Sequence, residues 1–402
     1  MDIKELRTHF PALHYQQFHY LDNAATTHKP KIVIDRITDF YTQEYATVQR
    51  GLYDAGEHAT GSYEWVRDLV ASFIGAQESS EIVFTKGTTE GINFIATSWA
   101  RAQLKKGDEI IVSALEHHAN LIPWQQVAQH TGAQLSIIPL KDEHGHLDIK
   151  AYEQMLSAKT KLVAITAISN AIGTHPDLKA IIDKAHAVGA YVLVDAAQLV
   201  AHRPIDVQEL NADFLVFSGH KMFGPTGVGV LYIKKDVHDQ VMPYQFGGGM
   251  VYQVSYHTAQ WAKAPHCYEA GTPPIASVLG LGSAIQFLNR IDRYAVQKHE
   301  ASLCAQFIQR LKKLKQVRIL GDPDYLSSHG HLVSFVVNTM HAHDVAAYLN
   351  SKRIAVRAGH FCAQPLLQEL HVNAAVRMSV ALYNDENDIH ACAYALEEIA
   401  KF

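Results

Sequence analysis

The sequence has few cysteines and no long apolar run. Its four cysteines stand far apart, at Cys267, Cys304, Cys362 and Cys392, a distribution that fits neither a disulfide scaffold nor a zinc framework and suits a reducing compartment. No stretch approaches the length of a membrane-spanning helix, and the first residues mix acidic and basic side chains without an apolar core. We therefore expect a cytoplasmic protein with no membrane association.

Runs of one charge are also missing. The 40 acidic residues outnumber the 35 Lys and Arg, which gives a formal net charge of -5, and no basic cluster could follow a phosphate backbone. The 25 histidines are scattered, and none belongs to an HExxH or CxxC framework. The sequence thus argues against a nucleic-acid partner and against a metal site.

The chain is long for a single hydrophobic core. With 402 residues, of which 48% are hydrophobic, two domains are expected. Short apolar runs rich in β-branched residues alternate with helical patterns in the first two thirds, at 81–84, 109–114, 135–140, 161–166, 191–195, 214–218 and 228–233. This alternation predicts an α/β sheet with crossover helices.

The pattern changes after residue 277. A long helical stretch is followed by short apolar runs and a closing helix. We interpret residues 17–277 as a large domain, and residues 1–16 and 278–402 as a smaller α+β domain.

The most informative stretch spans residues 213–233, where an apolar run leads into a polar loop with Ser218, His220 and Lys221. A lysine at a strand end can form a Schiff base with a phosphorylated aldehyde while Ser218 and His220 hold the phosphate. Taken alone, Lys221 could equally be a loop lysine without a role.

A second strand end supports the functional interpretation. Asp195 ends an apolar run and is followed closely by Gln198. A carboxylate there can pair with a protonated ring nitrogen, and the amide of Gln198 can hydrogen-bond a ring hydroxyl. Asp195 could also cap a crossover helix. The two roles are compatible, and the presence of Lys221 favours the first.

Other polar residues also follow apolar runs. Thr88 and Thr89 stand where a helix begins, so hydroxyls and backbone N–H groups could bind an anion, although such a turn can simply cap a helix. His118 could stack on a planar ring or move a proton, and Asn170 follows the next run. Since open α/β sheets bind ligands at the carboxyl ends of their strands, we expect these residues at one site.

Seven motifs follow one another along the chain: TTEGIN at 88–93, EHHAN at 116–120, SNAIG at 169–173, VDAAQ at 194–198, SGHK at 218–221, YEAGTPP at 268–274 and RAGHFCAQP at 357–365. In this order they resemble the cysteine desulfurases of the SufS/CsdA type, which are fold-type I pyridoxal-phosphate enzymes. The resemblance implies a large domain with a mixed, mostly parallel seven-stranded sheet and a smaller α+β domain.

The resemblance also implies a cofactor, pyridoxal 5'-phosphate, and residues that hold it. Lys221 would be the Schiff-base lysine, and Asp195 the partner of the pyridine nitrogen. Gln198 would contact the ring oxygen, while His118 would stack on the ring and assist proton transfer. The phosphate-binding residues would be Thr88 or Thr89, Ser218, His220 and, from the neighbouring subunit of a homodimer, Thr272.

The implied substrate is L-cysteine, and the implied products are L-alanine and a persulfide on Cys362. Arg357 would clamp the substrate carboxylate with help from Asn170, and Arg50 would be available near the entrance. Cys362 lies on a Gly-containing loop beside Arg357 and His360, a cationic setting that favours the thiolate. We interpret the remaining cysteines differently: Cys304 and Cys392 as buried structural thiols and Cys267 as undecided.

Two of the positions that depart from the family pattern replace histidines. Phe361 stands where a second histidine is often found, and Tyr53 replaces another histidine. The short cysteine loop is similar to that of the subgroup that passes its sulfur to an acceptor protein of the SufE, CsdE or SufU kind, for iron–sulfur cluster assembly or related sulfur transfer. The alternatives are a selenocysteine lyase, another pyridoxal-phosphate reaction on this fold, and a catalytically silent binding protein.

Overall fold

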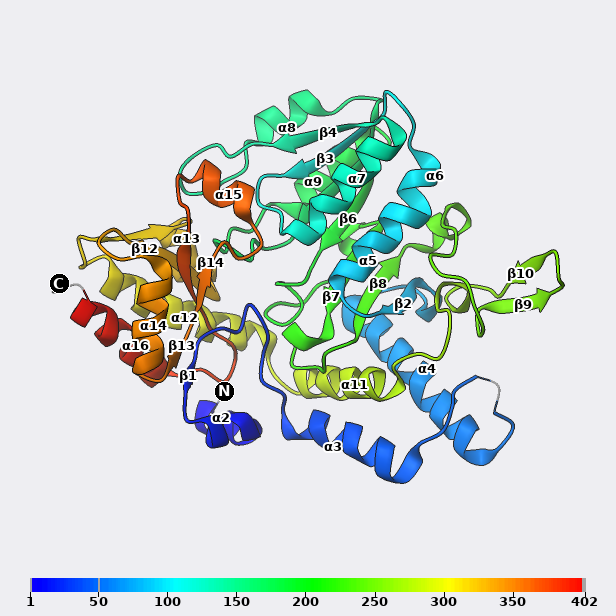
Figure 1. Cartoon of the computed structure of the whole chain (residues 1–402), viewed down its shortest axis with the longest axis horizontal. Helices are drawn as coiled ribbons and strands as arrows, with labels where there is room; N and C mark the ends of the chain where they lie inside the picture. Colours follow the sequence, from blue (N-terminus) through cyan, green and yellow to red (C-terminus); the bar gives the residue numbers. More distant parts are fainter. Residues whose placement is uncertain (1, 50, 400–402) are drawn as a thin grey trace.

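The computed structural model describes residues 2–49 and 51–399. Two sheets, each covered by helices, form its two halves (Figure 1). The larger half contains a seven-stranded sheet with the order β2-β8-β7-β6-β5-β3-β4. Its strands are β2 (Ile82–Thr85), β3 (Glu109–Ser113), β4 (Gln134–Ile138), β5 (Thr160–Thr166), β6 (Tyr191–Asp195), β7 (Phe214–Ser218) and β8 (Gly229–Ile233).

Six of the seven strands lie parallel to one another through the sheet, and β8 runs antiparallel between β7 and β2. The predicted fold class, an α/β fold with a mixed, mostly parallel seven-stranded sheet, is confirmed. The seven apolar runs in the sequence coincide with the seven strands to within two residues at either end. The reason is physical: both faces of this sheet are buried, so its strands read as continuous apolar runs.

Helices cover both faces of the large sheet, and alternate strand residues face opposite layers. Ile110 and Val112 of β3 pack in one core with α5 and α7, whereas Ile111 packs in the other with α4, α9 and α11. The helices of this half are α3 (Lys31–Asp39), α4 (Asp54–Ile74), α5 (Thr88–Ile95), α6 (Arg101–Gln103), α7 (Ile122–Thr131), α8 (Ile149–Met155), α9 (Leu178–Ala187), α10 (Val207–Leu210) and α11 (Ile275–Asn289).

The smaller half is built on an antiparallel sheet with the order β11-β12-β15-β14. Its strands are β11 (Val317–Leu320), β12 (Leu332–Val337), β14 (Arg357–Gly359) and β15 (Ala375–Ser379), and the short pair β1 (His19–Tyr20) and β13 (Ile354–Ala355) lies beside it. The remaining helices are α1 (Ile3–Thr8), α2 (Pro11–Gln16), α12 (Arg293–Leu311), α13 (Pro323–His329), α14 (Ala342–Ser351), α15 (Gln364–Glu369) and α16 (Glu386–Ile399).

The N-terminal segment contacts the smaller half, where Arg7 donates to the carbonyl of Tyr383 at 2.7 Å and to Asp388 at 3.1 Å. The assignment of residues 1–16 to the small domain stays a prediction. The domain division at residue 277 stays a prediction, because α11 begins at Ile275 and packs against α3 and α4 of the large half. A hairpin of β9 (Val251–Val254) and β10 (Ala259–Trp261) projects from that half (Figure 1). No helix within the described ranges is long and apolar enough to cross a membrane.

Candidate active site

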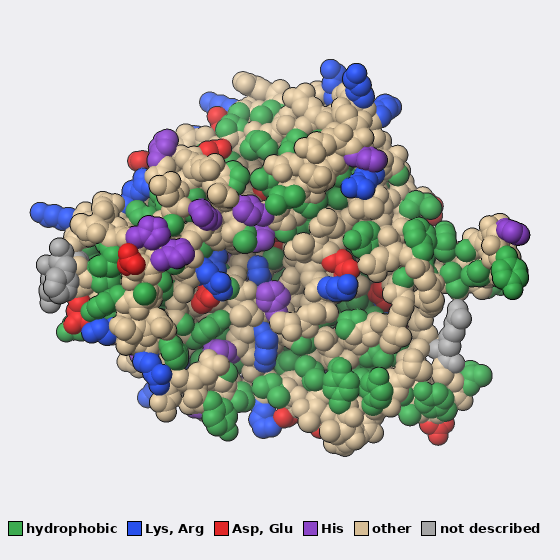
Figure 2. All heavy atoms as spheres, in the orientation of Figure 1, with side chains coloured by type: hydrophobic (Ala, Val, Ile, Leu, Met, Phe, Trp, Pro, Cys, Tyr) green, Lys and Arg blue, Asp and Glu red, His purple; other side chains and the backbone are tan. Residues whose placement is uncertain are grey.

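A cavity of about 690 Å³ opens between the two halves, at the carboxyl ends of β5, β6 and β7. Histidines and basic side chains gather around this hollow on the face drawn in Figure 2. Its walls come from segments far apart in the sequence, and include Thr88, Thr89, His117, His118, Asn170, Asp195, Gln198, Ser218, His220, Lys221, Arg357, Cys362 and Arg377. The structure therefore brings together most of the residues singled out from the sequence.

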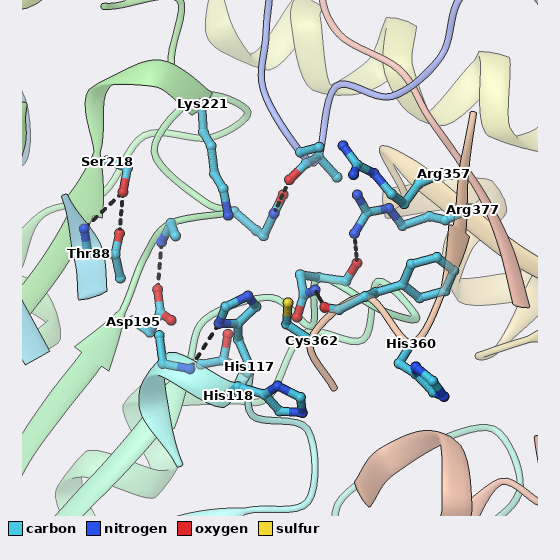
Figure 3. Close-up of a pocket in the computed structure, with 18 of the residues that line it drawn as sticks. Thr88, His117, His118, Asp195, Ser218, Lys221, Arg357, His360, Cys362 and Arg377 are labelled. Carbon is cyan, nitrogen blue, oxygen red and sulfur yellow. Dashed lines mark hydrogen bonds between the residues drawn. The ribbon is translucent and has the colours of Figure 1, made fainter. Parts of the chain in front are cut away.

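Lys221 reaches into the cavity from a single 3₁₀ turn, Gly219–Lys221, directly after β7 (Figure 3). Burial lowers the pKa of its amine, while the nearby Asp195 carboxylate opposes this shift. A lowered pKa increases the neutral fraction of the amine, the form that attacks an aldehyde.

Asp195 ends β6 and is 4% exposed. Burial raises the pKa of its carboxyl group. The hydrogen bond that its Oδ1 accepts from the N–H of Ala197 at 2.9 Å opposes this shift. The alternative role as a helix cap is wrong: the residues after Asp195 lie in turns, and the next helix, α10, is capped by Asp206. Gln198 lies in these turns and donates to the carbonyl of Ala24 at 2.8 Å, so one amide hydrogen is left for a ligand.

Ser218 and the start of α5 form a cup of donors. The Ser218 hydroxyl accepts from the N–H of Thr88 at 2.9 Å and contacts the Thr88 hydroxyl at 2.8 Å. First-turn N–H groups of a helix have no partner inside the helix, which suits an anion. His220 contacts the hydroxyl of Thr26 at 3.2 Å, and burial lowers its pKa to about 4.

His117 and His118 point in different directions (Figure 3). Nδ1 of His117 accepts from the N–H of Ala119 at 3.0 Å, and burial, followed by the charge of Lys221, lowers the pKa of His117 to about 4. His118 instead accepts from the N–H of Gln364 at 3.1 Å, and the charge near it belongs to His360. Of the two rings, that of His117 lies within electrostatic range of Lys221, and sequence reasoning had assigned His117 no role.

Cys362 is exposed, whereas the other three cysteines are buried. Its carbonyl accepts from the N–H of His118 at 2.7 Å, and the preceding carbonyl, of Phe361, accepts from the amide of Asn170 at 2.6 Å. The interpretation of Cys304 and Cys392 as buried thiols is confirmed, and burial raises the pKa of Cys267 to about 11. The reactive candidate is thus the one thiol held at the cavity.

Two arginines from the small sheet face the cavity. Arg357 pairs with Asp22 at 2.7 Å and is exposed, while the buried Arg377 donates to the carbonyl of Asn170 at 2.7 Å and lies 3.5 Å from Asp22. Sequence reasoning did not assign Arg377 a role. Its position on β15, opposite Arg357 in the strand register, was the only available signal.

One predicted residue lies elsewhere. Thr272 is exposed and lines a separate hollow of about 260 Å³ with Gln49 and Gly248. Arg50 lies outside the described residues. In the described part of the chain, no group of three or more His, Cys, Asp and Glu side chains could hold a metal ion.

The residues of the cavity fit a phosphorylated pyridine aldehyde. An amine, a carboxylate and a donor cup are the three groups that such a molecule requires, for its aldehyde, ring nitrogen and phosphate respectively. Two buried polar atoms of the cavity have no partner within the described residues: Oδ1 of Asn170 and Nε of Arg377. Because a buried polar atom without a partner costs free energy, these two atoms indicate a ligand.

Comparison with known proteins gave consistent matches over the full length. Residues 19–392 match the family model for aminotransferase class-V. A probable cysteine desulfurase of Halalkalibacterium halodurans is 44% identical over 406 residues, which cover 100% of this chain and 99% of that protein. A cysteine desulfurase of Pectobacterium atrosepticum is 40% identical, over 99% of this chain and 98% of the relative.

Solved structures agree. The cysteine desulfurase CsdA of Escherichia coli superimposes with a TM-score of 0.93 and 38% identity, covering 100% of this chain and 99% of the other. A cysteine desulfurase of Thermococcus onnurineus gives a TM-score of 0.95 and 37% identity, over 99% of this chain and 98% of the other.

Proposed function

This chain belongs to the aminotransferase class-V family and is a cysteine desulfurase, and we propose that it works through Lys221 and Cys362, which convert L-cysteine to L-alanine and hold the sulfur as a persulfide. The observation that supports these roles is the placement of an exposed thiol at the mouth of a cavity whose floor carries a buried amine and a buried carboxylate.

Pyridoxal 5'-phosphate, on which enzymes of this kind depend, supplies when bound an electron sink that weakens bonds to the α-carbon of an amino acid. Lys221 would hold the cofactor, and afterwards move a proton, because burial favours its neutral amine. Asp195 would pair with the ring nitrogen and Gln198 with the ring oxygen. Thr88, Thr89, Ser218 and His220 would bind the phosphate.

His117 is our choice for the ring that stacks on the cofactor, in place of the sequence-based choice, His118. With Nδ1 occupied by the N–H of Ala119, its remaining proton lies on Nε2, and its low pKa keeps the ring neutral at physiological pH. A neutral ring beside Lys221 avoids repulsion between two cations.

The substrate carboxylate would bind Arg377 and Arg357, with Asn170 beside it. Both arginines are held at Asp22, so an incoming carboxylate would compete with Asp22 for the same guanidinium groups. This arrangement directs the amino acid with its sulfur toward Cys362.

Cys362 thiolate would then attack the substrate sulfur. A sulfur–sulfur bond forms while the carbon–sulfur bond breaks, and the electron pair of that bond stays with the carbon, which is protonated and leaves as L-alanine. The guanidinium groups of Arg357 and Arg377 lie within electrostatic range of Cys362.

We further propose that the persulfide passes to an acceptor protein of the SufE, CsdE or SufU kind and that two chains form a homodimer. The exposed position of Cys362 supports the first proposal. The distance of Thr272 from its own chain's cavity supports the second, since Thr272 is then free to reach the phosphate of a neighbouring subunit. Iron–sulfur cluster assembly is the expected use of the sulfur.

A selenocysteine lyase is the second candidate. It would need the same cavity but not the thiol, because selenium is eliminated more readily than sulfur. Relative turnover of the wild type on L-cysteine and L-selenocysteine decides between the two.

The first test measures alanine and sulfide release from L-cysteine, with and without a reductant, on the wild type, Cys362→Ala and Lys221→Ala. We expect the wild type and Cys362→Ala to be yellow, and Lys221→Ala to lose the absorption band of the bound cofactor. Of these three proteins, only the wild type should release alanine. Cys267→Ala, which removes a buried thiol outside the cavity, is the matched control and should keep its activity. Equal turnover by Cys362→Ala would refute the role of this thiol.

A further inference from the structure

The residue before the reactive cysteine has an unusual backbone and a buried side chain. Phe361 and Cys362 have φ angles of 54° and 55°, in the left-handed region that non-glycine residues rarely enter. Two consecutive residues of this kind persist only where their surroundings hold them. The Phe361 side chain is only 8% exposed, although its neighbour Cys362 is exposed.

Three contacts hold this pair of residues. The carbonyl of Phe361 accepts from the Asn170 amide at 2.6 Å, and the carbonyl of Cys362 accepts from the N–H of His118 at 2.7 Å. The third contact involves the side chain, since the Arg377 guanidinium lies over the Phe361 ring at 5.0 Å from the centroid. Arg377 in turn donates to the carbonyl of Asn170, which closes a circuit from Phe361 to Arg377 to Asn170 and back.

The aromatic face matters to Arg377 because that guanidinium is poorly compensated. It is 3% exposed, its Nε has no partner within the described residues, and Asp22 lies 3.5 Å away. Burial lowers its pKa to about 10. A ring face stabilises such a buried cation, whereas an aliphatic side chain of equal size only fills the space.

We propose that Phe361 is a positioning residue which fixes Arg377 beside Cys362, so that the group that binds the substrate carboxylate and the thiol that takes the sulfur keep one fixed separation. The proposal rests on the proposed function, in which Arg377 and Cys362 have these roles. The phenylalanine would then do more than fill the core, because the contact of its ring with Arg377 connects the cysteine loop to β15.

The test compares the alkylation of Cys362 in the holoenzyme by iodoacetate and by iodoacetamide, followed by mass spectrometry of the Cys362 peptide. Iodoacetate carries a carboxylate that Arg377 attracts, and iodoacetamide does not, so the ratio of the two rates reports how Arg377 lies relative to the thiol. In Phe361→Leu we expect this ratio to fall about fivefold, the order of one cation–π contact. In Phe361→Tyr, which keeps the ring, it should stay within about twofold of the wild type.

KM and kcat for L-cysteine give a second readout. Phe361→Leu should raise KM by about the same factor as it lowers the alkylation ratio, with an unchanged visible spectrum, and Phe361→Tyr should keep KM. Phe361→Met takes the place of the leucine variant if that protein does not fold. A ratio and a KM that stay at wild-type values in a folded leucine or methionine variant would overturn the proposal.

The alkylation result does not depend on turnover. If Cys362→Ala releases alanine as fast as the wild type, the proposed function fails, but the ratio still shows whether the Phe361 ring orients Arg377. If the function holds and the ratio does not change, only the role of Phe361 fails.

Discussion

At the scale of single residues, the backbone decides which of two adjacent histidines faces the chemistry. His117 precedes a 3₁₀ turn, His118–Asn120, and its side chain caps that turn through Nδ1. His118 is inside the turn and faces the cysteine loop. Two neighbouring side chains in an irregular segment point in different directions, so equal residue types carry unequal roles.

The pair allows a matched prediction. His117→Gln should lower kcat at least tenfold and shift the visible band of the holoenzyme, because the ring beside Lys221 is lost. His118→Gln should lower kcat less than threefold and leave the band in place. Steady-state kinetics and the visible spectrum of the two variants check this. The reverse order of effects would return the stacking role to His118.

The residues that could be found from the sequence share a simple signal. Asp195 ends a buried strand and Lys221 lies in the turn directly after another, where a buried charged side chain is costly unless something binds it. Sequence reasoning did not identify Arg377 because this residue lies within an apolar strand of the small sheet. The direction of its side chain depends on the pairing of β15 with β14 and β12. No local pattern reports such pairing.

At the scale of elements, the phosphate cup depends on how closely three strands approach one another. Gly229 begins β8 and pairs with Ser218 of β7 on one side and with Thr85 of β2 on the other. A Cβ atom at Gly229 would lie 2.4 Å from Cα of Gly87 and 2.7 Å from the carbonyl oxygen of Phe217. Backbone atoms cannot yield as side chains do, so the strands would have to separate.

Gly229→Ala should therefore weaken cofactor binding, because it displaces Gly87 and Ser218 together. We expect the dissociation constant of pyridoxal 5'-phosphate, measured by spectral titration of the cofactor-free protein, to rise about tenfold or more, as overpacking costs of 1–3 kcal/mol suggest. Gly61→Ala, where a Cβ meets nothing within 4 Å, is the control. Equal affinities in both variants would contradict the argument.

A buried ion pair joins α4 to the strand beneath it. Arg67 is 1% exposed, pairs with Glu269 at 2.7 Å and donates to the carbonyl of Ile82 at 2.8 Å. Glu269 also accepts from the N–H of Phe84 at 2.7 Å and from the hydroxyl of Tyr63 at 3.1 Å. The partners lie in α4, in β2 and in the segment that carries Glu269, so the pair holds these three parts of the chain together.

Arg67→Met should lower the free energy of unfolding by about 3–5 kcal/mol, since it leaves Glu269 buried without its cation. Adding Glu269→Gln should recover part of that loss. Lys31→Met breaks an exposed pair with Asp35 instead and should cost less than about 1 kcal/mol. Urea midpoints of the variants give the comparison; a similar shift in Arg67→Met and Lys31→Met would show that the buried pair is no more important than the exposed one.

Elements were predictable from the sequence to the extent that burial defines them. Apart from the edge strand β4, which is only partly buried, the strands of the large sheet are buried on both faces, and all seven were identified to within two residues. The pair β1 and β13 has two residues in each strand, and the β9–β10 hairpin is largely exposed. Such elements exist through contacts with distant segments, so the local sequence gives little sign of them.

At the scale of the whole molecule, the N-terminal segment joins the two halves. Asp22 follows β1, which pairs with β13 of the small half, and its carboxylate contacts both arginines of the small sheet. A few residues later, Thr27 reaches the other half, where its N–H donates to the carbonyl of His220 at 3.1 Å. Amino-acid binding, cofactor binding and the packing of the halves thus share one short segment.

His28 reports on this packing through its protonation. Its ring lies against Tyr20 at 4.2 Å and Tyr383 at 5.8 Å, and burial, followed by the charge of Lys29, lowers its pKa to about 4. The unfolded chain would bind a proton at His28 below its ordinary pKa of about 6.5, while the folded protein binds it only near pH 4. Stability contributed by the neutral ring is therefore lost as pH falls from about 6.5 to about 4.

The proton that His28 takes up on unfolding can be measured. When the protein is unfolded by urea in weakly buffered solution at pH 5.5, the wild type should take up about one proton more per chain than His28→Gln, since the unfolded histidine is then about nine-tenths protonated and the folded one is neutral. At pH 8 the two proteins should take up equal amounts, because the ring is neutral in both states. Equal uptake at pH 5.5 as well would mean that His28 titrates in the folded protein as it does in water, and that the segment between the halves leaves this ring open to solvent.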